Sequence, residues 1–331
     1  MVDVTIIGAG VVGLCVARVL CDLGAQVSVV DRGDAPGPQA CSWWAGGMLA
    51  PYCEGESAEE PVVRLGQEAA AWWQDKTNAV QRHGSLVLSL TRDHADLRLF
   101  ARRTDHFVNV DQDQIAALEP DLGGRFNKGL FFESEAHLAP RAALAVLHAD
   151  LINDGVTFTC QEVDPSDFSK QGLTIDCRGY GAKPDLADLR GVKGEMLLLS
   201  CPDMTLSRPI RLLHPRIPLY IVPRGDGVFM LGATMIESSA SRHVTARALL
   251  EMLSAAYALN PAFGEAEVLE IGVDTRPAFA DNLPRIRKCA NLITVNGLYR
   301  HGFLLAPAVA RMVGALIFDN IKPEVMDEHS A

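Results

Sequence analysis

The first 31 residues combine a strand, a glycine-rich turn, a helix and a second strand in an order that few folds accommodate. Residues 2–8 are rich in β-branched side chains and end in glycine, which predicts a buried parallel strand. The turn that follows has three glycines in a G-x-G-x-x-G spacing: Gly8, Gly10 and Gly13. Residues 14–23 then predict a helix, and residues 26–31 predict a second strand that ends in Asp31. This order predicts a dinucleotide-binding unit of the Rossmann type within an α/β fold.

Each part of this unit has a physical task. Gly8 allows the tight turn from strand to helix, and Gly13 lets the helix pack closely on the strand. Gly10 has no Cβ, so a pyrophosphate can approach the backbone, where the start of the helix offers free N–H groups and partial positive charge. Asp31 can accept hydrogen bonds from ribose hydroxyls and would repel a 2′-phosphate. The alternative interpretation is a glycine-rich turn of another α/β fold. Such a turn would not require a strand, three glycines, a helix, a second strand and a final acid in this order.

The segment that follows the second strand distinguishes cofactors better than the glycine motif, which is shared by NAD and FAD proteins. Residues 39–51 form a loop of small residues with a Trp43–Trp44 pair. Small residues suit a chain that wraps closely around a rigid ligand. An ordinary surface loop with two tryptophans packed into a nearby core is the alternative, and composition alone leaves both interpretations open.

Four stretches together resemble the D-amino acid oxidase family of flavoenzymes, from residue 2 to about residue 318. The stretches are Ala45–Pro51, Tyr220–Arg224 with Leu231–Met235, Thr275–Pro277 with Asp281–Pro284, and Leu298–Pro307. Within the family, the resemblance is to the glycine oxidases of the thiamine pathway. The chain departs from the usual pattern at Trp43–Trp44, where smaller residues are common, at Asp176–Gly181, which replaces an Ala-x-Gly flavin contact, and at His301, where Asn is frequent.

The length of 331 residues allows about two domains. The strand and helix pattern and the resemblance predict an α/β protein, α+β overall, with a Rossmann-like FAD-binding domain that is discontinuous in sequence. This domain is predicted to comprise residues 1–85, 135–190 and 275–331. An antiparallel-sheet substrate domain, residues 86–134 and 191–274, is predicted to be inserted into it.

The resemblance implies FAD as the cofactor, bound without a covalent link. In sarcosine oxidases with covalent flavin, the linking cysteine lies near the C-terminal flavin motif, whereas the last cysteine of this chain, Cys289, precedes that motif. The start of the last predicted helix, at Gly302–Phe303, would direct its positive dipole end at the flavin pyrimidine ring. The predicted cofactor-binding residues are Gly8, Gly10, Val11, Val12, Gly13, Asp31, Arg32, Ser42, Ala45, Gly46, Gly47, Met48, Val163, Cys177, Gly179, Tyr299, Arg300, His301, Gly302, Phe303 and Leu304. No metal site is predicted.

Flavin-dependent amine oxidation asks the protein for position and charge, because the cofactor performs the difficult chemical step. An amino acid is best oriented by its carboxylate, and the planar fork of arginine matches both oxygens. Arg276 is the first candidate, and the carboxylate-binding arginine of the family falls at this position. A salt bridge between domains is the alternative role for Arg276.

Three further residues complete the predicted substrate site. Tyr220 would share the carboxylate, although a core tyrosine is an equal alternative. Met235 would form a pocket wall, with a core position as its alternative. Arg300 would line the site, with a structural role as its alternative, and Tyr220, Arg276 and Arg300 are the predicted catalytic residues. His301 is interpreted as structural, because this mechanism needs no general base.

The function predicted first is oxidative deamination of glycine and other small amino acids or amines. The substrate Cα would give a hydride to flavin N5, the imine would hydrolyse to glyoxylate and ammonia, and molecular oxygen would become hydrogen peroxide. In thiamine biosynthesis the imine would instead feed thiazole assembly. The alternatives are a dehydrogenase for D-amino acids or secondary amines that uses a non-oxygen acceptor, and a non-catalytic flavin-binding assembly factor.

Charge and cysteine content limit the partners. The net charge of −11 and the lack of a dense Lys/Arg run argue against nucleic acid. None of the eight cysteines forms a C-x-x-C pair, and the pattern suits a reducing cytoplasm. A secretory signal is not predicted, and the apolar helix candidates are shorter than a bilayer span, so no stable membrane insertion is expected. A homo-oligomer is left open.

Overall fold

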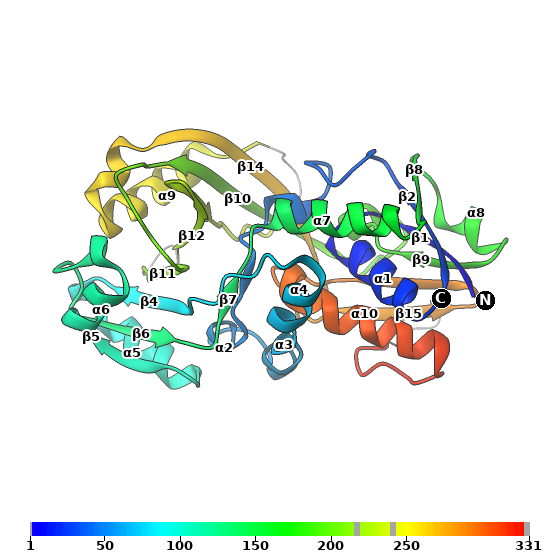
Figure 1. The fold of residues 1–331 in the computed structure, drawn as a ribbon, viewed down its shortest axis with the longest axis horizontal. Helices are drawn as coiled ribbons and strands as arrows, with labels where there is room; N and C mark the ends of the chain where they lie inside the picture. The colour runs from blue at the N-terminus through cyan, green and yellow to red at the C-terminus, as the bar shows by residue number, and fades with distance from the viewer. Residues whose placement is uncertain (1, 215–218, 239–242, 328–331) are drawn as a thin grey trace.

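The computed structural model describes residues 2–214, 219–238 and 243–327, and its two large sheets lie at opposite ends of an elongated molecule (Figure 1). The first sheet has six strands in the order β15-β16-β9-β1-β2-β8. Its strands pair in parallel, except that β15 is antiparallel to β16. The strands are β1 (Asp3–Ile7), β2 (Gln26–Asp31), β8 (Thr157–Cys160), β9 (Leu173–Asp176), β15 (Arg285–Cys289) and β16 (Leu292–Asn296).

Helices bury this sheet in one apolar core, as a mostly parallel sheet requires. Helix α1 (Val11–Asp22) packs against α10 (Gly302–Phe318) and α7 (Pro140–Asn153), while α3 (Glu60–Gly66) and α4 (Ala69–Thr77) pack on α10. Helix α10 is apolar on almost every side, which is typical of a helix enclosed in a core. Its N-terminal end and that of α1 remain available for the cofactor site.

The second sheet has eight strands in the order β14-β10-β13-β12-β11-β4-β6-β5. One neighbouring pair, β4 with β11, is parallel, so the predicted antiparallel sheet is mixed at this point. The two strands come from separate insertions and are not joined by a hairpin, so nothing requires them to run in opposite directions. The strands are β4 (Ser85–Ser89), β5 (Val108–Asp111), β6 (Lys128–Phe132), β10 (Arg190–Ser200), β11 (Ile210–Leu213), β12 (Leu219–Gly225), β13 (Val228–Gly232) and β14 (Glu267–Ala278).

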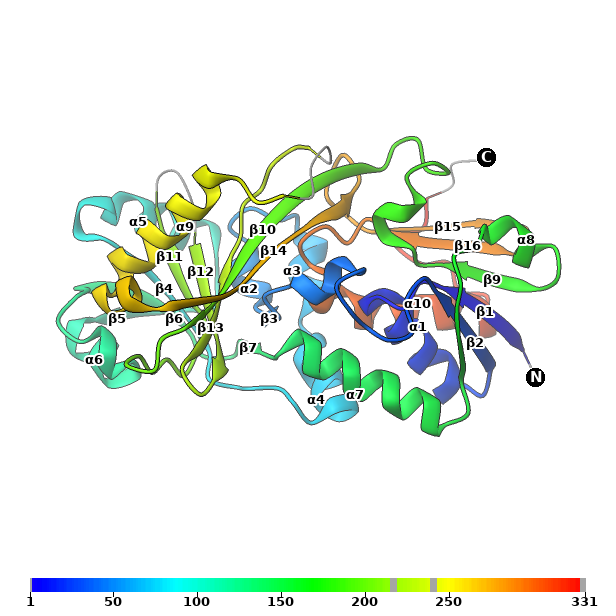
Figure 2. The same cartoon turned by 90° about the horizontal axis from the view of Figure 1, so that it is seen from above.

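Strands β10 and β14 are the longest in the molecule as described, and both run from the large sheet towards the six-stranded one (Figure 2). They pair antiparallel, with Val192 opposite Arg276 and Gly194 opposite Asp274. Strand β14 therefore extends side chains from the second sheet to the cofactor end of the first. Helix α9 (Ala246–Leu259) packs on β12 and β13, and the Thr245 hydroxyl caps its start by accepting from the Ala248 N–H.

The remaining elements are short and lie in the segments between the strands of the two sheets. They are β3 (Met48–Leu49), β7 (Ala136–His137), α2 (Pro51–Glu54), α5 (His94–Arg103), α6 (Gln112–Leu118), α8 (Pro165–Ser169) and the 3-10 helices η1 (Cys41–Trp44), η2 (Thr91–Asp93), η3 (Pro120–Leu122), η4 (Gly179–Ala182) and η5 (Pro261–Glu265). The Trp43–Trp44 pair thus lies in a 3-10 turn rather than in an irregular loop. Within the described residues, no helix combines the length and apolar character needed to cross a membrane.

We propose the domain division expected from the sequence. Every strand of the six-stranded sheet lies in the ranges 1–85, 135–190 and 275–331. The strands of the eight-stranded sheet lie in 86–134 and 191–274, apart from single residues at the ends of β4 and β10 and the end of β14, which continues to Ala278. Residues 1, 215–218, 239–242 and 328–331 of these ranges lie outside the described residues.

Candidate FAD and substrate site

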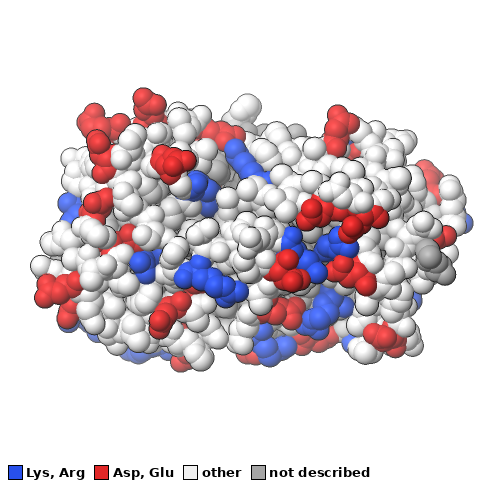
Figure 3. All heavy atoms as spheres, viewed as in Figure 1, with Lys and Arg blue, Asp and Glu red and all other residues white. Residues whose placement is uncertain are grey.

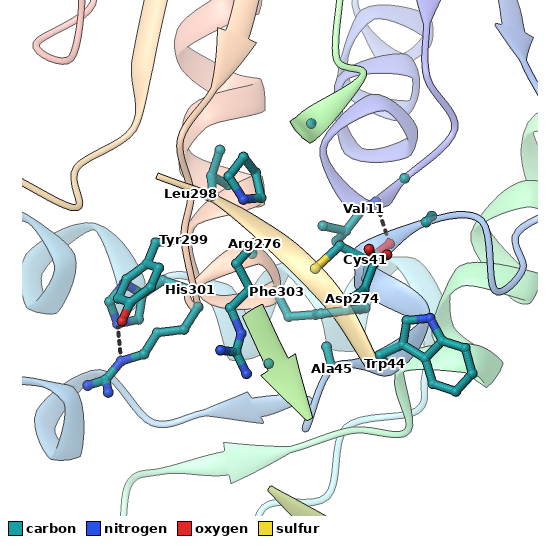
Figure 4. A pocket seen from close by; sticks show the side chains of 18 of the residues that line it. Val11, Cys41, Trp44, Ala45, Asp274, Arg276, Leu298, Tyr299, His301 and Phe303 are labelled. Atoms are coloured by element: carbon teal, nitrogen blue, oxygen red, sulfur yellow. Dashed lines mark hydrogen bonds between the residues drawn. The ribbon is translucent and has the colours of Figure 1, made fainter. Parts of the chain in front are cut away.

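A single cavity of about 780 Å³ extends from the carboxyl ends of β1 and β2 to strands β12 and β14 (Figure 4). Gly8, Gly10 and Asp31 line one end, and Tyr220 and Arg276 line the other. The volume is near the upper end of the range for small-molecule sites, as an extended ligand requires. The glycine motif and the predicted substrate residues therefore share one cavity.

The glycines at the first end are required by packing. Gly8 has φ +103°, and a Cβ on it would lie 2.6 Å from the carbonyl oxygen of Cys177. A Cβ on Gly13 would lie 1.8 Å from the Gly8 carbonyl oxygen. A Cβ on Gly10 would meet only Ser42 Oγ, at 3.6 Å, so Gly10 leaves its backbone open to the cavity.

Helix α1 begins at this opening. The Val11 N–H donates to Ser42 Oγ at 3.2 Å, and the first turn contains no acidic side chain. Gly10, Val11 and Val12 line the cavity, so free N–H groups and the positive end of the helix dipole face it. This arrangement fits the pyrophosphate of a dinucleotide.

Asp31 is held in place by backbone amides. Its Oδ2 accepts from the Ala9 N–H at 2.7 Å, and its Oδ1 accepts from the Gly33 N–H at 2.9 Å. Each carboxylate oxygen can accept a further hydrogen bond, and Asp31 lines the cavity. The oriented carboxylate fits the hydroxyls of a ribose.

The loop after η1 is fixed by a half-buried arginine, Arg224, that the sequence analysis did not predict. Arg224 donates to the carbonyl oxygens of Gly46 at 2.7 Å, Ala45 at 3.3 Å and Leu138 at 3.3 Å. Burial, together with nearby Arg141, lowers the pKa of Arg224 to about 10. The only sequence signal for this role is its place in the stretch Tyr220–Arg224.

Most of the predicted cofactor residues line the cavity, and two do not. Gly13 lies behind Gly8, where it allows close packing of α1. Val163 lies between β8 and α8, and Gln161 of the same segment lines the cavity instead. Lining residues that were not among the predicted site residues include Gln39, Cys41, Trp44, Glu54, Ser57, Arg178, Lys183, Gly194 and Arg211.

Arg276 enters the cavity from β14. In Figure 4 its side chain lies between Tyr299 and His301 on one side and Cys41 on the other. Its Nη1 donates to the carbonyl oxygen of Thr234 at 2.9 Å, and within the described part of the chain it forms no ion pair. Among the described residues, Arg276 therefore does not form the salt bridge between domains that is its alternative role. Its charge is available to an anionic ligand.

Tyr220 stands beside Arg276 with its ring held between two backbone segments. It pairs with Gly232 across β12 and β13, where a Cβ on Gly232 would lie 2.7 Å from the phenol oxygen. On the other side, a Cβ on Gly46 would lie 2.8 Å from Cε2 of the ring. Burial raises the pKa of Tyr220, against the opposing effect of Arg276, so the phenol stays a neutral hydrogen-bond donor.

Met235 and Arg300 meet at the same end of the cavity. Met235 is 46% exposed, so it is a wall residue and not a core methionine. Arg300 Nη1 lies 3.4 Å from Met235 Sδ, and Nη2 donates to Ser57 Oγ at 2.8 Å. Nη2 also lies 2.7 Å from Glu54 Oε2, so Arg300, unlike Arg276, is ion-paired.

The carboxylate of Glu54, which the sequence analysis did not single out, contacts Arg211, Arg300 and His301. Its Oε1 pairs with Arg211, and its Oε2 lies 2.9 Å from His301 Nε2. Burial opposes ionisation of this carboxyl, yet Arg300, Arg211 and His301 hold its pKa well below the usual range. Burial lowers the pKa of His301, against the effect of Glu54, which agrees with a structural His301. The one sequence signal for Glu54 is its position just after Ala45–Pro51.

A Rossmann-type phosphate site shares one cavity with Arg276, an arginine that forms no ion pair within the described residues. This combination is typical of a dinucleotide-dependent oxidoreductase of the flavoprotein class. A family model described as FAD dependent oxidoreductase (DAO) matches residues 3–316. The chain belongs to this D-amino acid oxidase family, and the fold and the cofactor FAD expected from the sequence are confirmed.

Individual relatives agree with this assignment. The chain is 51% identical over 319 residues to a protein of Rhizobium etli named as thiamine biosynthesis oxidoreductase ThiO, covering 96% of this chain and 97% of the relative. It is 26% identical to a glycine oxidase of Pseudomonas aeruginosa, covering 95% and 94%. The crystal structure of glycine oxidase from Geobacillus kaustophilus shares the fold, with a TM-score of 0.81 at 22% identity, covering 99% of this chain and 98% of that one.

Proposed function

We propose that this enzyme oxidises glycine and other small amino acids or amines to imines, and that the imine serves thiazole formation in thiamine biosynthesis or hydrolyses to glyoxylate and ammonia. The observation that carries the proposal is the guanidinium of Arg276, which has no ion-pair partner among the described residues, beside the neutral phenol of Tyr220 in the same cavity as the glycine motif. The names of the Rhizobium etli and Pseudomonas aeruginosa relatives support the same substrate class.

The chain's own residues would hold the substrate by its carboxylate. The fork of Arg276 would accept both oxygens, and Tyr220 would donate to one of them. Gly46 lies against the Tyr220 ring, so the carboxylate site and the flavin loop are built as one unit. This geometry would orient the Cα–H bond of glycine, which has no side chain to be recognised.

The residues of the cavity fit FAD: the start of α1 would hold the phosphates, Asp31 the ribose, and the loop at Ala45–Gly47 with the start of α10 the flavin. When bound, FAD would supply the oxidising chemistry, accepting a hydride from the substrate Cα and passing two electrons to an acceptor. Gly302, Phe303 and Leu304 line the cavity, so the positive end of the α10 dipole would stabilise negative charge that develops there.

We propose molecular oxygen as the acceptor, reduced to hydrogen peroxide. A polyanionic partner is not favoured, because the net charge is −11 and acidic side chains are interspersed among the basic ones on the face shown in Figure 3. The alternative to this oxidase is a dehydrogenase that acts on D-amino acids or secondary amines and passes the electrons to an acceptor other than oxygen.

The test is steady-state turnover of the FAD-loaded protein with glycine, sarcosine and D-alanine in aerated buffer. We expect hydrogen peroxide and ammonia in equal amounts with glycine, together with glyoxylate. Substrate-dependent reduction of an artificial electron acceptor without peroxide would favour the dehydrogenase. If no amine bleaches the flavin absorbance under anaerobic conditions, the proposed activity is wrong.

A further inference from the structure

Two arginines, Arg276 and Arg300, present guanidinium groups to the substrate end of the cavity, but only Arg300 has a carboxylate partner among the described residues. Arg276 donates to a backbone carbonyl and has no carboxylate within the described residues, whereas Arg300 lies 2.7 Å from Glu54. In Figure 4, Tyr299 and His301, the neighbours of Arg300 in the chain, lie beside Arg276. Of these two arginines, Arg276 thus carries an available positive charge, whereas the charge of Arg300 is already neutralised by Glu54.

Glu54 is built into the wall of the cavity. Its side chain is 12% exposed and contacts Arg300, Arg211 and His301 with its two oxygens. Glu54, Arg300, Arg276 and Arg211 all act electrostatically on the phenol of Tyr220, and all four line the same cavity.

We propose that Glu54 selects substrates with a single carboxylate, because it neutralises Arg300 and repels a second anionic group. This inference rests on the proposed function, in which Arg276 holds the substrate carboxylate. A second carboxylate, as in iminodiacetate or D-aspartate, would have to displace Glu54 from Arg300 or lie beside it. Like charges in a buried site repel strongly, so such substrates are rejected.

The remaining groups around Arg300 cannot replace this carboxylate. Ser57 Oγ and Met235 Sδ are neutral, and Arg211 adds a second buried cation on the other oxygen of Glu54. Removing the charge of Glu54 would take the ion-pair partner from the partly exposed Arg300 and from the buried Arg211, which is unfavourable. A second substrate carboxylate would relieve this excess charge, so the same change that weakens the cluster should admit dicarboxylates.

The test compares the FAD-loaded parent with Glu54→Gln, which keeps the size of the side chain and one acceptor oxygen but removes its charge. We expect the ratio of kcat/KM for iminodiacetate to kcat/KM for glycine to rise at least ~10-fold in the variant, and the same for D-aspartate. A matched control is Glu119→Gln. Glu119 is also a carboxylate with little exposure, 1% against 12% for Glu54, and it pairs with Arg208 at 2.7 Å, but it does not line the cavity, so its loss should leave the ratio unchanged.

Two further measurements make the outcome decisive. Malonate binding, followed by perturbation of the flavin absorbance, should tighten at least ~10-fold in Glu54→Gln, and the gain should disappear in the double variant Glu54→Gln/Arg300→Met. If the parent oxidises no amine, the proposed function fails, while tighter malonate binding would still support the role of Glu54.

Unchanged selectivity together with unchanged malonate binding in the FAD-loaded Glu54→Gln would overturn the inference. If this variant does not retain FAD, Glu54→Asp provides the same test, because it keeps the charge but withdraws it from Arg300. It should show a smaller rise in the same ratio, and a constant ratio would then overturn the inference.

Discussion

The guanidinium group of Arg276 occupies the space in which a side chain on Gly194 would begin. A Cβ built on Gly194 would lie 2.2 Å from Nη2 and 2.3 Å from Cζ of Arg276. The register of β10 and β14 places Gly194 opposite Asp274, two residues from Arg276 along β14, so the arginine side chain crosses the neighbouring strand at a residue without a Cβ. The direction of Arg276 into the cavity therefore depends on a glycine in another strand.

Substitution Gly194→Ala should displace Arg276 without touching the cofactor site. We expect kcat/KM for glycine to fall ~10-fold to ~100-fold, because small errors in substrate position are costly in rate. Flavin content should stay normal. The control is Gly172→Ala, where a Cβ would meet no atom within 4 Å. Equal kinetics for both variants would show that Arg276 tolerates a neighbouring methyl group.

Substitution Arg276→Ala should remove the carboxylate anchor. We expect kcat/KM for glycine to fall at least ~100-fold, about 2.7 kcal/mol of transition-state stabilisation, with Arg276→Lys between the variant and the parent. Amines without a carboxylate should be much less affected, and FAD content should be normal. Near-parental turnover of glycine by the FAD-loaded Ala variant would rule out this role and make Arg300 the next candidate.

Substitution Asp31→Ala should weaken FAD binding. Loss of a charge-assisted hydrogen bond to the ribose corresponds to roughly 1.5–3 kcal/mol, or a ~10-fold to ~150-fold higher Kd. Part of the effect would come from the Ala9 and Gly33 amides, which lose their acceptor. Asp31→Asn keeps an acceptor but lacks the charge and should be intermediate. An unchanged Kd in titrations of the apoprotein would show that Asp31 does not contact the ribose.

Glu135 should make stability depend on pH. The side chain is buried between β6 and β7, its Oε1 accepts from the Cys53 N–H at 2.7 Å, and burial raises its pKa to about 7. The unfolded chain releases this proton near pH 4.3, so the folded state loses stability as the pH rises from about 4.3 to about 7, by up to about 4 kcal/mol.

Glu135→Gln retains an acceptor for the Cys53 amide but has no proton to lose. Its Tm should therefore exceed that of the parent by roughly 5 °C or more near pH 8, and the difference should shrink towards pH 5. Thermal unfolding of both FAD-loaded proteins across this pH range measures the effect. A Tm difference that does not vary with pH would mean that Glu135 does not change its ionisation between pH 5 and pH 8.

FAD should be bound tightly but without a covalent link. Acid precipitation should release the flavin into a yellow supernatant, because the fit rests on hydrogen bonds, the two helix N-termini and packing. A yellow pellet would contradict this prediction, and so would a colourless native protein that ignores added FAD.

The sequence by itself determined the features that lie close together along the chain. The spacing of Gly8, Gly10 and Gly13 and the place of Asp31 predict the phosphate and ribose sites, because a strand, a tight turn and a helix bring these residues together within one local unit. Arg276 and Tyr220 were found through a resemblance that rests on short local motifs. Short strands such as β3 and β7 have too few residues to show a periodic pattern, and were missed.

Only the tertiary structure decided how charges and small residues meet across the two sheets. The sequence presents Arg276 and Arg300 as similar candidates, but the fold leaves the first unpaired and bonds the second to Glu54. Likewise, only the strand register reveals that Gly194 makes room for Arg276. These contacts join residues far apart in the chain, and their energies depend on burial and on distances of a few ångströms. Strand pairing and packing set these distances, and no local sequence pattern encodes them.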